Sequence, residues 1–271
     1  MVNVDLHNHL GRNGANPGFD ETIDIAYSRL GRGGIFGICN DGPADNRCEN
    51  FAKQKGGNYS RVSVGDEKKP TAIWVPEKDI LVVNVEEVEP EEGGHFLCVG
   101  MPRGEKIGTT NLEEALKRAD DFGVGKVIVH AFEYGGFGHY LKEEPGILER
   151  FDGFEVYNAS AALGDWFPLL GFMANHKASN FYRDNINGKY NVGALSFTDG
   201  HSAEVIGLSY TPFFTKEINP EIGNVLNPLI NEMHGSKDDF YLMKRPARWD
   251  AMKHVTHMVE HAIKTKIKRQ K

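Results

Sequence analysis

Two histidines stand two residues apart, directly after the first apolar run of the chain. The run VDLHNH, at residues 4–9, contains them as His7 and His9. Residues i and i+2 of a β-strand point to the same face, so both imidazoles can face one point. Such a pair can hold a metal ion, or the two residues can be ordinary surface histidines at the end of a strand. The other residues of the chain distinguish between these two interpretations.

Other apolar runs of the chain also end in side chains that can bind a metal ion. These side chains are Asp41, Glu86 with Glu87 beside it, His130, Glu155, Asp199 and His201. His95 opens a further apolar run and can return to the same pocket across a hairpin. Because the carboxyl ends of the strands of a βα barrel meet at one face, we expect these side chains to lie close together.

Imidazole and carboxylate groups are the ligands on offer, and this set suits Zn, Mn or Fe(II). Cys39, Cys48 and Cys98 have no CxxC spacing, which fits reduced thiols better than a disulfide framework or a thiolate zinc site. Glu86 is the expected bridging ligand, since one carboxylate can join two metal ions about 3.5–4 Å apart. The sequence therefore predicts a two-metal hydrolytic centre.

Apolar runs alternate with amphipathic segments almost to the end of the chain, which is the pattern of βα units. Strands are expected within residues 2–7, 34–39, 71–75, 79–88, 95–100, 126–132, 153–159, 192–199 and 204–211. Helices are expected at about 20–31, 112–122, 160–185, 219–233 and 247–268. The polar segment 42–70 is expected to be a long loop or insertion. Without a GxGxxG or Walker phosphate loop, the pattern favours a single α/β barrel domain over residues 1–271.

The composition limits the class of protein and of partner. A chain of 271 residues is long enough for one barrel. Its formal net charge of −7 argues against long nucleic acid and favours a small substrate. No apolar stretch of about 18 residues and no signal-peptide pattern occurs, so we expect no membrane segment and a cytoplasmic location. The sequence leaves the oligomeric state open.

The motifs together resemble those of one enzyme family. DLHNH, an acidic residue after the second strand, a Glu followed by a His, a lone strand-end His and FTDGH occur in the order of the polymerase and histidinol phosphatase (PHP) family of metal-dependent phosphoesterases. The resemblance spans residues 5–201. It implies a distorted (β/α)7, TIM-like barrel that binds two or three divalent metal ions. The implied metal ligands are His7, His9, Asp41, Glu86, His95, His130, Asp199 and His201.

Two positions depart from the pattern of this family. The histidine usually found a few residues after HxH is missing from LGRNGANPG, and the usual Asp-His reads Asn40-Asp41. These departures weaken the metal site that would rely on the missing histidine, Asp41 and His201, so two ions are better supported than three. Glu155 is expected to support the ligands or line the pocket. Arg12 and Arg103 are the candidate cations for a substrate phosphate, and the Gly-rich stretch 132–140 is a further candidate.

The resemblance implies hydrolysis of a phosphate ester by a metal-activated water. Asp199 or His201 would orient the water or protonate the leaving oxygen. The substrate would be a small phosphorylated molecule, either a phosphomonoester or a nucleotide-type phosphodiester.

Two alternative functions stay open. Amidohydrolases, which cleave C–N bonds, also begin with HxH, but they carry a lysine at a later strand end that has no obvious counterpart here. The second alternative is a metal-binding module without catalysis, which the two departures keep open.

Overall fold

The structure is a computed structural model of the chain, and it describes residues 1–11, 18–41, 45–54, 57–108, 110–162, 173–215 and 217–236. The strands are β1 (Val2–Asp5), β2 (Ile35–Asp41), β3 (Val62–Gly65), β4 (Pro70–Val75), β5 (Ile80–Val88), β6 (His95–Val99), β7 (Gly125–Val129), β8 (Gly153–Asn158), β9 (Gly193–Phe197) and β10 (Thr211–Phe213). The α-helices are α1 (Phe19–Leu30), α2 (Arg47–Ala52), α3 (Leu112–Phe122), α4 (Tyr140–Glu143), α6 (Ala174–Phe181) and α7 (Leu226–Gly235). Within the described ranges, no helix is long and apolar enough to cross a membrane.

The strands form one sheet that curves into a barrel. Its order is β10-β1-β2-β5-β6-β7-β8-β9, and β3 and β4 extend it beside β5. Neighbouring strands of this order run parallel except at two places: β6 is antiparallel to both β5 and β7, and β10 is antiparallel to β1. Asn8, beyond β1, forms a parallel bridge to Gly200, beyond β9, so the sheet nearly closes. The predicted distorted TIM-like barrel is thus confirmed, and the reversed β6 is its main distortion.

Side chains along each strand alternate between the inside of the barrel and the helices outside it. In β5, Leu81, Val83 and Val85 belong to the inner apolar cluster, whereas Val82 packs in the outer cluster with α1 and α2. The inner positions of β6 are Leu97 and Val99. This alternation decides which polar side chain at each strand end faces the barrel axis.

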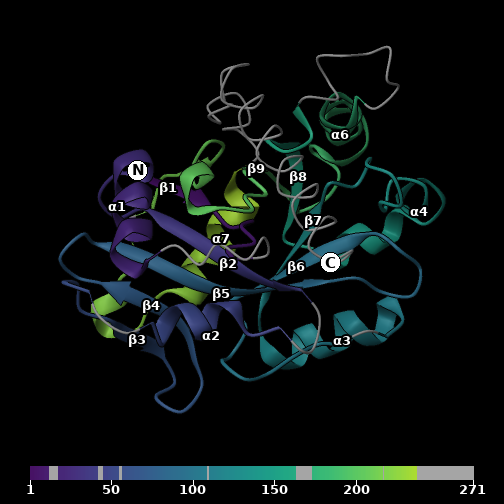
Figure 1. Cartoon of the computed structure of the whole chain (residues 1–271). Coiled ribbons are helices and arrows are strands. Elements are labelled where there is room, and N and C mark those ends of the chain that lie inside the picture. Colours follow the sequence, from purple (N-terminus) through teal and green to yellow (C-terminus); the bar gives the residue numbers. More distant parts are fainter. Residues whose placement is uncertain are drawn as a thin grey trace, which may run out of the picture.

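Helices cover the outside of the sheet in two groups (Figure 1). The apolar faces of α1 and α2 pack on β2, β4 and β5, while those of α3 and α6 pack on β6, β7 and β8. In α3, Leu112, Ala115, Leu116 and Ala119 recur at helical spacing and are buried. The Asn111 side chain accepts a hydrogen bond from the Glu114 N–H and caps this helix.

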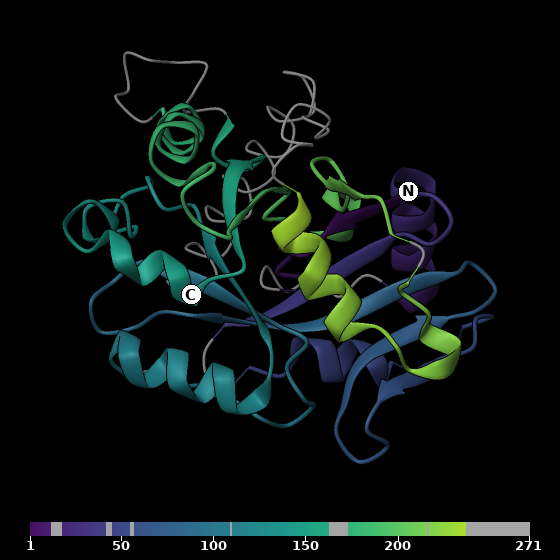
Figure 2. The same cartoon turned by 180° about the vertical axis from the view of Figure 1, so that it is seen from behind.

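Helix α7 closes the end of the barrel opposite the strand-end histidines, and Figure 2 shows it crossing the back of the sheet. Its Leu229 and Met233 belong to the inner apolar cluster. A Cβ atom at Gly193, the first residue of β9, would lie 1.5 Å from the carbonyl oxygen of Met233. Only glycine allows the helix to approach the strand so closely.

Several expected elements differ in the structure. The polar segment 42–70, expected to be a loop, contains the helix α2 and the edge strand β3. Only Val64 of β3 is buried, so its alternation of apolar and polar residues is too weak to read. The expected strand 204–211 is a 3₁₀ turn followed by β10, because Gly207, with φ of 70°, bends the chain there.

The expected helices also differ from the observed ones in part. The helix expected at 219–233 begins only at Leu226, after a 3₁₀ turn at Pro220–Ile222. Within the expected helix 160–185, the described part contains α6 and a π turn at Tyr182–Ile186. The helix expected at 247–268 lies outside the described residues.

Candidate metal centre

A cavity of about 370 Å³ lies where the parallel strands end. Strand-end residues form much of its wall, together with His95 from the start of the reversed strand β6. Its lining residues are His9, Asp41, Glu86, Glu87, Val88, Glu89, His95, Gly108, His130, Glu133, Asp199 and His201. The structure therefore brings together in one pocket most of the side chains that the sequence singled out.

The histidine pair of the HxH motif is buried and aimed at one point. His7 Nε2 and His9 Nε2 lie 3.1 Å apart, and Asp199 Oδ1 is 3.5 Å from the first and 3.4 Å from the second. Glu87 Oε2 lies 3.4 Å from His9 Nε2. Ligand atoms of a tetrahedral zinc ion, each about 2.0–2.1 Å from the metal, are about 3.4 Å apart. His7, His9 and Asp199 are therefore spaced as ligands of one ion would be, and Glu87 lies at a ligand-like distance from His9.

A second group of donors meets the other oxygen of Glu87. Glu87 Oε1 lies 3.0 Å from His130 Nε2 and 3.0 Å from His95 Nδ1. His95 Nδ1 is buried and makes no hydrogen bond within the described part of the chain. A buried nitrogen without a hydrogen bond, beside a carboxylate oxygen, fits a shared cation better than a polar contact alone. Glu87, His95 and His130 therefore fit the ligand set of a second ion.

Glu87, and not Glu86, takes the central position. Glu87 continues the inner alternation of Leu81, Val83 and Val85, whereas Glu86 only borders the cavity and turns its carboxylate away from the histidines. The Glu86 carboxylate accepts hydrogen bonds from the N–H groups of Ile107, at 2.8 Å, and Gly108, at 3.2 Å. The geometry therefore favours Glu87 over the predicted Glu86 as the carboxylate shared by the donors.

Carboxylates stand behind both histidines of the pair. Asp41 Oδ1 accepts a hydrogen bond from His9 Nδ1 at 2.7 Å, and Glu155 Oε1 accepts one from His7 Nδ1 at 3.3 Å. Each bond fixes the ring so that Nε2 faces the cluster, which is the arrangement that supports metal-binding histidines in proteins. Glu155 therefore stays a candidate to support His7. Asp41, expected to be a ligand, has the same supporting geometry toward His9.

Two residues of the cluster have an unusual backbone conformation. His130 and Asp199 have φ of 30° and 54°, in the left-handed region that non-glycine residues rarely adopt. Such a conformation costs on the order of 1–3 kcal/mol and concentrates at functional sites. In His130, the N–H donates to Glu155 Oε2 at 2.8 Å, which helps to hold this conformation.

The buried charges of the cluster shift one another's pKa values. Burial lowers the pKa of His9, but the charge of Glu87 and hydrogen bonds to Asp199 and Asp41 outweigh it and raise the pKa to about 9. Burial raises the pKa of Glu87, but the charge of His9 and the hydrogen bond from His130 bring it well below its ordinary value. The cluster therefore holds ionised carboxylates, and a metal ion would displace protons from its histidines.

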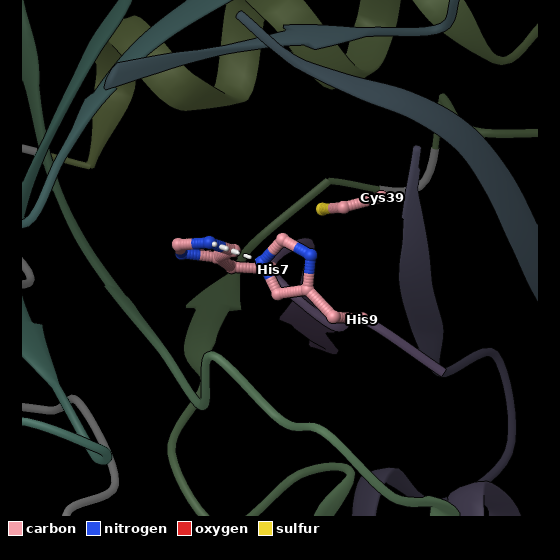
Figure 3. A group of neighbouring side chains, drawn as sticks. All are labelled: His7, His9 and Cys39. Carbon is pink, nitrogen blue, oxygen red and sulfur yellow. Dashed lines mark hydrogen bonds between the residues drawn. The ribbon is translucent and has the colours of Figure 1, made fainter. Parts of the chain in front are cut away.

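Cys39, on β2, lies next to the histidine pair, and Figure 3 shows its sulfur beside His7 and His9. The three ligand atoms lie within 4.8 Å of one another. Burial raises the pKa of the thiol well above its ordinary value, and Sγ donates to the Leu6 carbonyl oxygen at 3.5 Å. Cys39 thus packs under the pair as a neutral thiol, in agreement with the expected reduced state.

The remaining predicted residues do not all lie at the cavity. His201 lines the cavity, where Nδ1 donates to the Asp199 carbonyl oxygen at 3.1 Å and the ring stacks on His9. Arg103 lies at a small separate pocket beside Cys48 and does not line the cavity. Arg12 lies outside the described residues.

Sequence reasoning missed Glu133, which also lines the cavity. Its N–H donates to the His130 carbonyl oxygen at 3.0 Å, and burial raises the pKa of its carboxyl group. The one available signal was its position three residues after His130, within the Gly-rich stretch that we considered for phosphate binding.

Comparisons with known proteins give likeness in fold alone. No family model and no curated protein matches the sequence. The lesion-specific endonuclease EndoQ from Pyrococcus furiosus matches at a TM-score of 0.52 with 16% identity, over 86% of this chain and 56% of that chain. PsfC from Pseudomonas syringae PB-5123 matches at 0.53 with 10% identity, over 99% of this chain and 98% of that one. A two-domain protein from Bacteroides vulgatus ATCC 8482, containing a predicted PHP-like metal-dependent phosphoesterase, has a TM-score of 0.49 with 12% identity, over 87% and 63% of the two chains.

The matched structures agree with the predicted barrel at the level of the fold. The chain shares its fold with the lesion-specific endonuclease EndoQ, at 15–16% identity. The match to this chain covers 56% of the length of the endonuclease. A buried cluster of histidines and carboxylates at the strand ends makes the cavity a candidate centre for divalent metals.

Proposed function

We propose that this protein is a metal-dependent phosphoesterase. The observation that carries the proposal is the position of Glu87 between two groups of donors. One of its oxygens faces His95 and His130, and the other faces His9 of the HxH pair. A carboxylate placed in this way can bridge two ions, as in the two-metal sites of phosphatases and nucleases.

The donor set fits two divalent ions. His7, His9, Glu87 and Asp199 would hold one, and Glu87, His95 and His130 would hold the other. When bound, divalent ions lower the pKa of water toward neutrality and stabilise the charge that develops on a phosphoryl group. Imidazole nitrogens and carboxylate oxygens suit zinc, manganese or iron.

The protein's own residues prepare the site for this chemistry. Asp41 and Glu155 fix the orientation of His9 and His7, so little reorganisation is needed when ligands bind. His201 and Glu133, at the cavity wall, are the candidates to transfer a proton to or from the leaving oxygen. Because we propose Asp199 as a metal ligand, His201 and Glu133 are better candidates than Asp199 for proton transfer.

We favour a small phosphorylated substrate, because the formal net charge of the chain is −7. The same barrel serves a lesion-specific endonuclease, so the fold itself does not exclude nucleic acid. A C–N hydrolase is less well supported, because none of the cavity-lining residues that the structure describes is a lysine.

Metal content and hydrolysis together test the proposal. Purified protein is analysed for bound metals and assayed with p-nitrophenyl phosphate and bis-p-nitrophenyl phosphate, with and without added Mn²⁺ or Zn²⁺. We expect about two ions per chain and hydrolysis of at least one ester, both lost in the His7→Ala and Asp199→Ala variants. His176→Ala, which removes an exposed histidine on α6, is the matched control and retains both. Wild-type protein that binds metal without hydrolysing either ester would favour a binding module.

A further inference from the structure

Arg47, the first residue of α2, lies directly behind the histidine pair. Its Nη1 is 3.0 Å from Asp41 Oδ2 and 3.4 Å from His9 Nδ1, and its Nη2 is 3.0 Å from Asp45 Oδ2. Asp45 Oδ2 also accepts the N–H of Asp41 at 2.9 Å. The side chain of Arg47 is only 17% exposed. The guanidinium is thus held between two carboxylates at the edge of the cluster.

This arrangement bears on the third metal ion that the family resemblance allows. That ion would rely on Asp41, His201 and a histidine that the sequence lacks. Both oxygens of Asp41 have partners here, since Oδ1 accepts from His9 and Oδ2 contacts Arg47. An arginine side chain stays charged at every physiological pH, so a divalent ion on Asp41 would meet a like charge at close range. Asp41, paired with Arg47, is therefore a poor ligand for a third ion, although its carboxylate lies within 4.8 Å of ligand atoms of His9 and Glu87.

We propose that Arg47 takes the place of a third metal ion in this chain and acts as a positioning residue, holding Asp41 against His9. The inference rests on the proposed function. The guanidinium supplies a permanent positive charge that neutralises Asp41, and its two contacts fix the carboxylate that orients His9. Arg47 reaches the metal site through Asp41 and His9, and we assign it no contact with the substrate.

The inference is tested by counting bound Mn²⁺ directly. Mn²⁺ is titrated into metal-free protein, and free Mn²⁺ is measured by electron paramagnetic resonance. We expect two bound ions for wild-type protein. In Arg47→Met, which keeps the length of the side chain without its charge, the ion held by His9 should bind about 10–100-fold more weakly, the loss found when a group supporting a metal ligand is removed. Arg47→Lys should recover only part of the lost Mn²⁺ affinity, because an ammonium group cannot pair with both carboxylates in the same way.

Two further variants complete the experiment. Arg32→Met removes an arginine that is 81% exposed and pairs with Asp79, and it should bind Mn²⁺ as the wild type does. Asp41→Asn keeps Arg47 and removes the carboxylate, so it should weaken the same ion even if Arg47→Met does not fold.

The outcomes separate this inference from the proposed function. A third Mn²⁺ in the wild type, or unchanged affinities in folded Arg47→Met, would overturn the inference alone. Two bound ions without hydrolysis of any phosphate ester would overturn the catalytic function and leave the role of Arg47 in place. A wild type that binds no Mn²⁺ would overturn both.

Discussion

Glu87 is the residue on which both groups of histidines converge, and its neighbour Glu86 provides a natural control. Glu87→Gln removes the charge that the cluster shares, so we expect the metal content to fall below two ions per chain. Hydrolysis should fall by more than about 100-fold, because a loss of about 10–100-fold is typical of residues that only support a metal ligand. The Glu86→Gln variant should keep both metal ions. Its unfolding free energy should fall by about 1–3 kcal/mol, because one of the two backbone N–H groups that donate to Glu86 loses its acceptor. Metal analysis and chemical denaturation of both variants check this. The reverse pattern would restore Glu86 as the ligand.

The histidine pKa values predict how metal-free protein responds to pH. The pKa of His9 is raised to about 9 in the folded state, above its value of about 6.5 in the unfolded chain. Its stabilising contribution is therefore complete below pH 6.5 and is lost as the pH rises through 9. We expect the melting temperature of protein treated with a chelator to fall between pH 6.5 and 9. A flat or rising profile would contradict this distribution of charge.

The sequence singled out most of the residues that line the cavity, but not the side that each one faces. His7, His9, His130 and Asp199 follow apolar runs, and His95 opens one. The sequence could not distinguish Glu86 from Glu87, and the reason is physical. The run ILVVNVEEV is buried on both faces, so its sequence contains no alternation to show which glutamate faces inward.

Among the elements, Asp5 connects the first barrel strand to the segments around the last. Its Oδ1 accepts the Thr198 N–H at 2.9 Å, and its Oδ2 accepts the Gly207 N–H at 2.8 Å. Asp5→Asn leaves one of these buried N–H groups without an acceptor, so we expect a loss of about 1–3 kcal/mol in unfolding free energy. Asp121→Asn, on the exposed side of α3, is the control and should change stability by less than about 0.5 kcal/mol. Equal stability of the two variants would show that Asp5 does not join these strands.

Elements with strong periodicity could be predicted, and those fixed by long-range contacts could not. The helix expected at 112–122 matches α3 because its apolar spacing, its Asn111 cap and Gly123 agree. The turn around Gly207 depends on Asp5, far away in the sequence, and the edge strand β3 buries only Val64, so it shows no readable alternation. Arg47 was missed although Asp41 is close in the sequence, because their contact appears only when α2 folds back beside β2.

Metal binding should stabilise the whole folded molecule against unfolding. Ions that bind only the folded chain raise its unfolding free energy by about 2.7 kcal/mol at a free concentration of 100 times Kd. For a domain of this size, that corresponds to a rise in melting temperature of about 5–10 °C. We expect the melting temperature of the wild type to be higher by this amount with Mn²⁺ than with a chelator. In Glu87→Gln, the same comparison should give only a small difference. Equal melting temperatures of the wild type in both conditions would speak against a metal centre.

The central claim is that Glu87 lies between two metal ions in this barrel. Crystals grown with Mn²⁺ and measured at the manganese absorption edge test it most directly. The predicted anomalous map has one peak among His7, His9, Glu87 and Asp199, and a second among Glu87, His95 and His130, with none beside Arg47. A map without peaks at Glu87, or with manganese bound to Glu86, would contradict the claim.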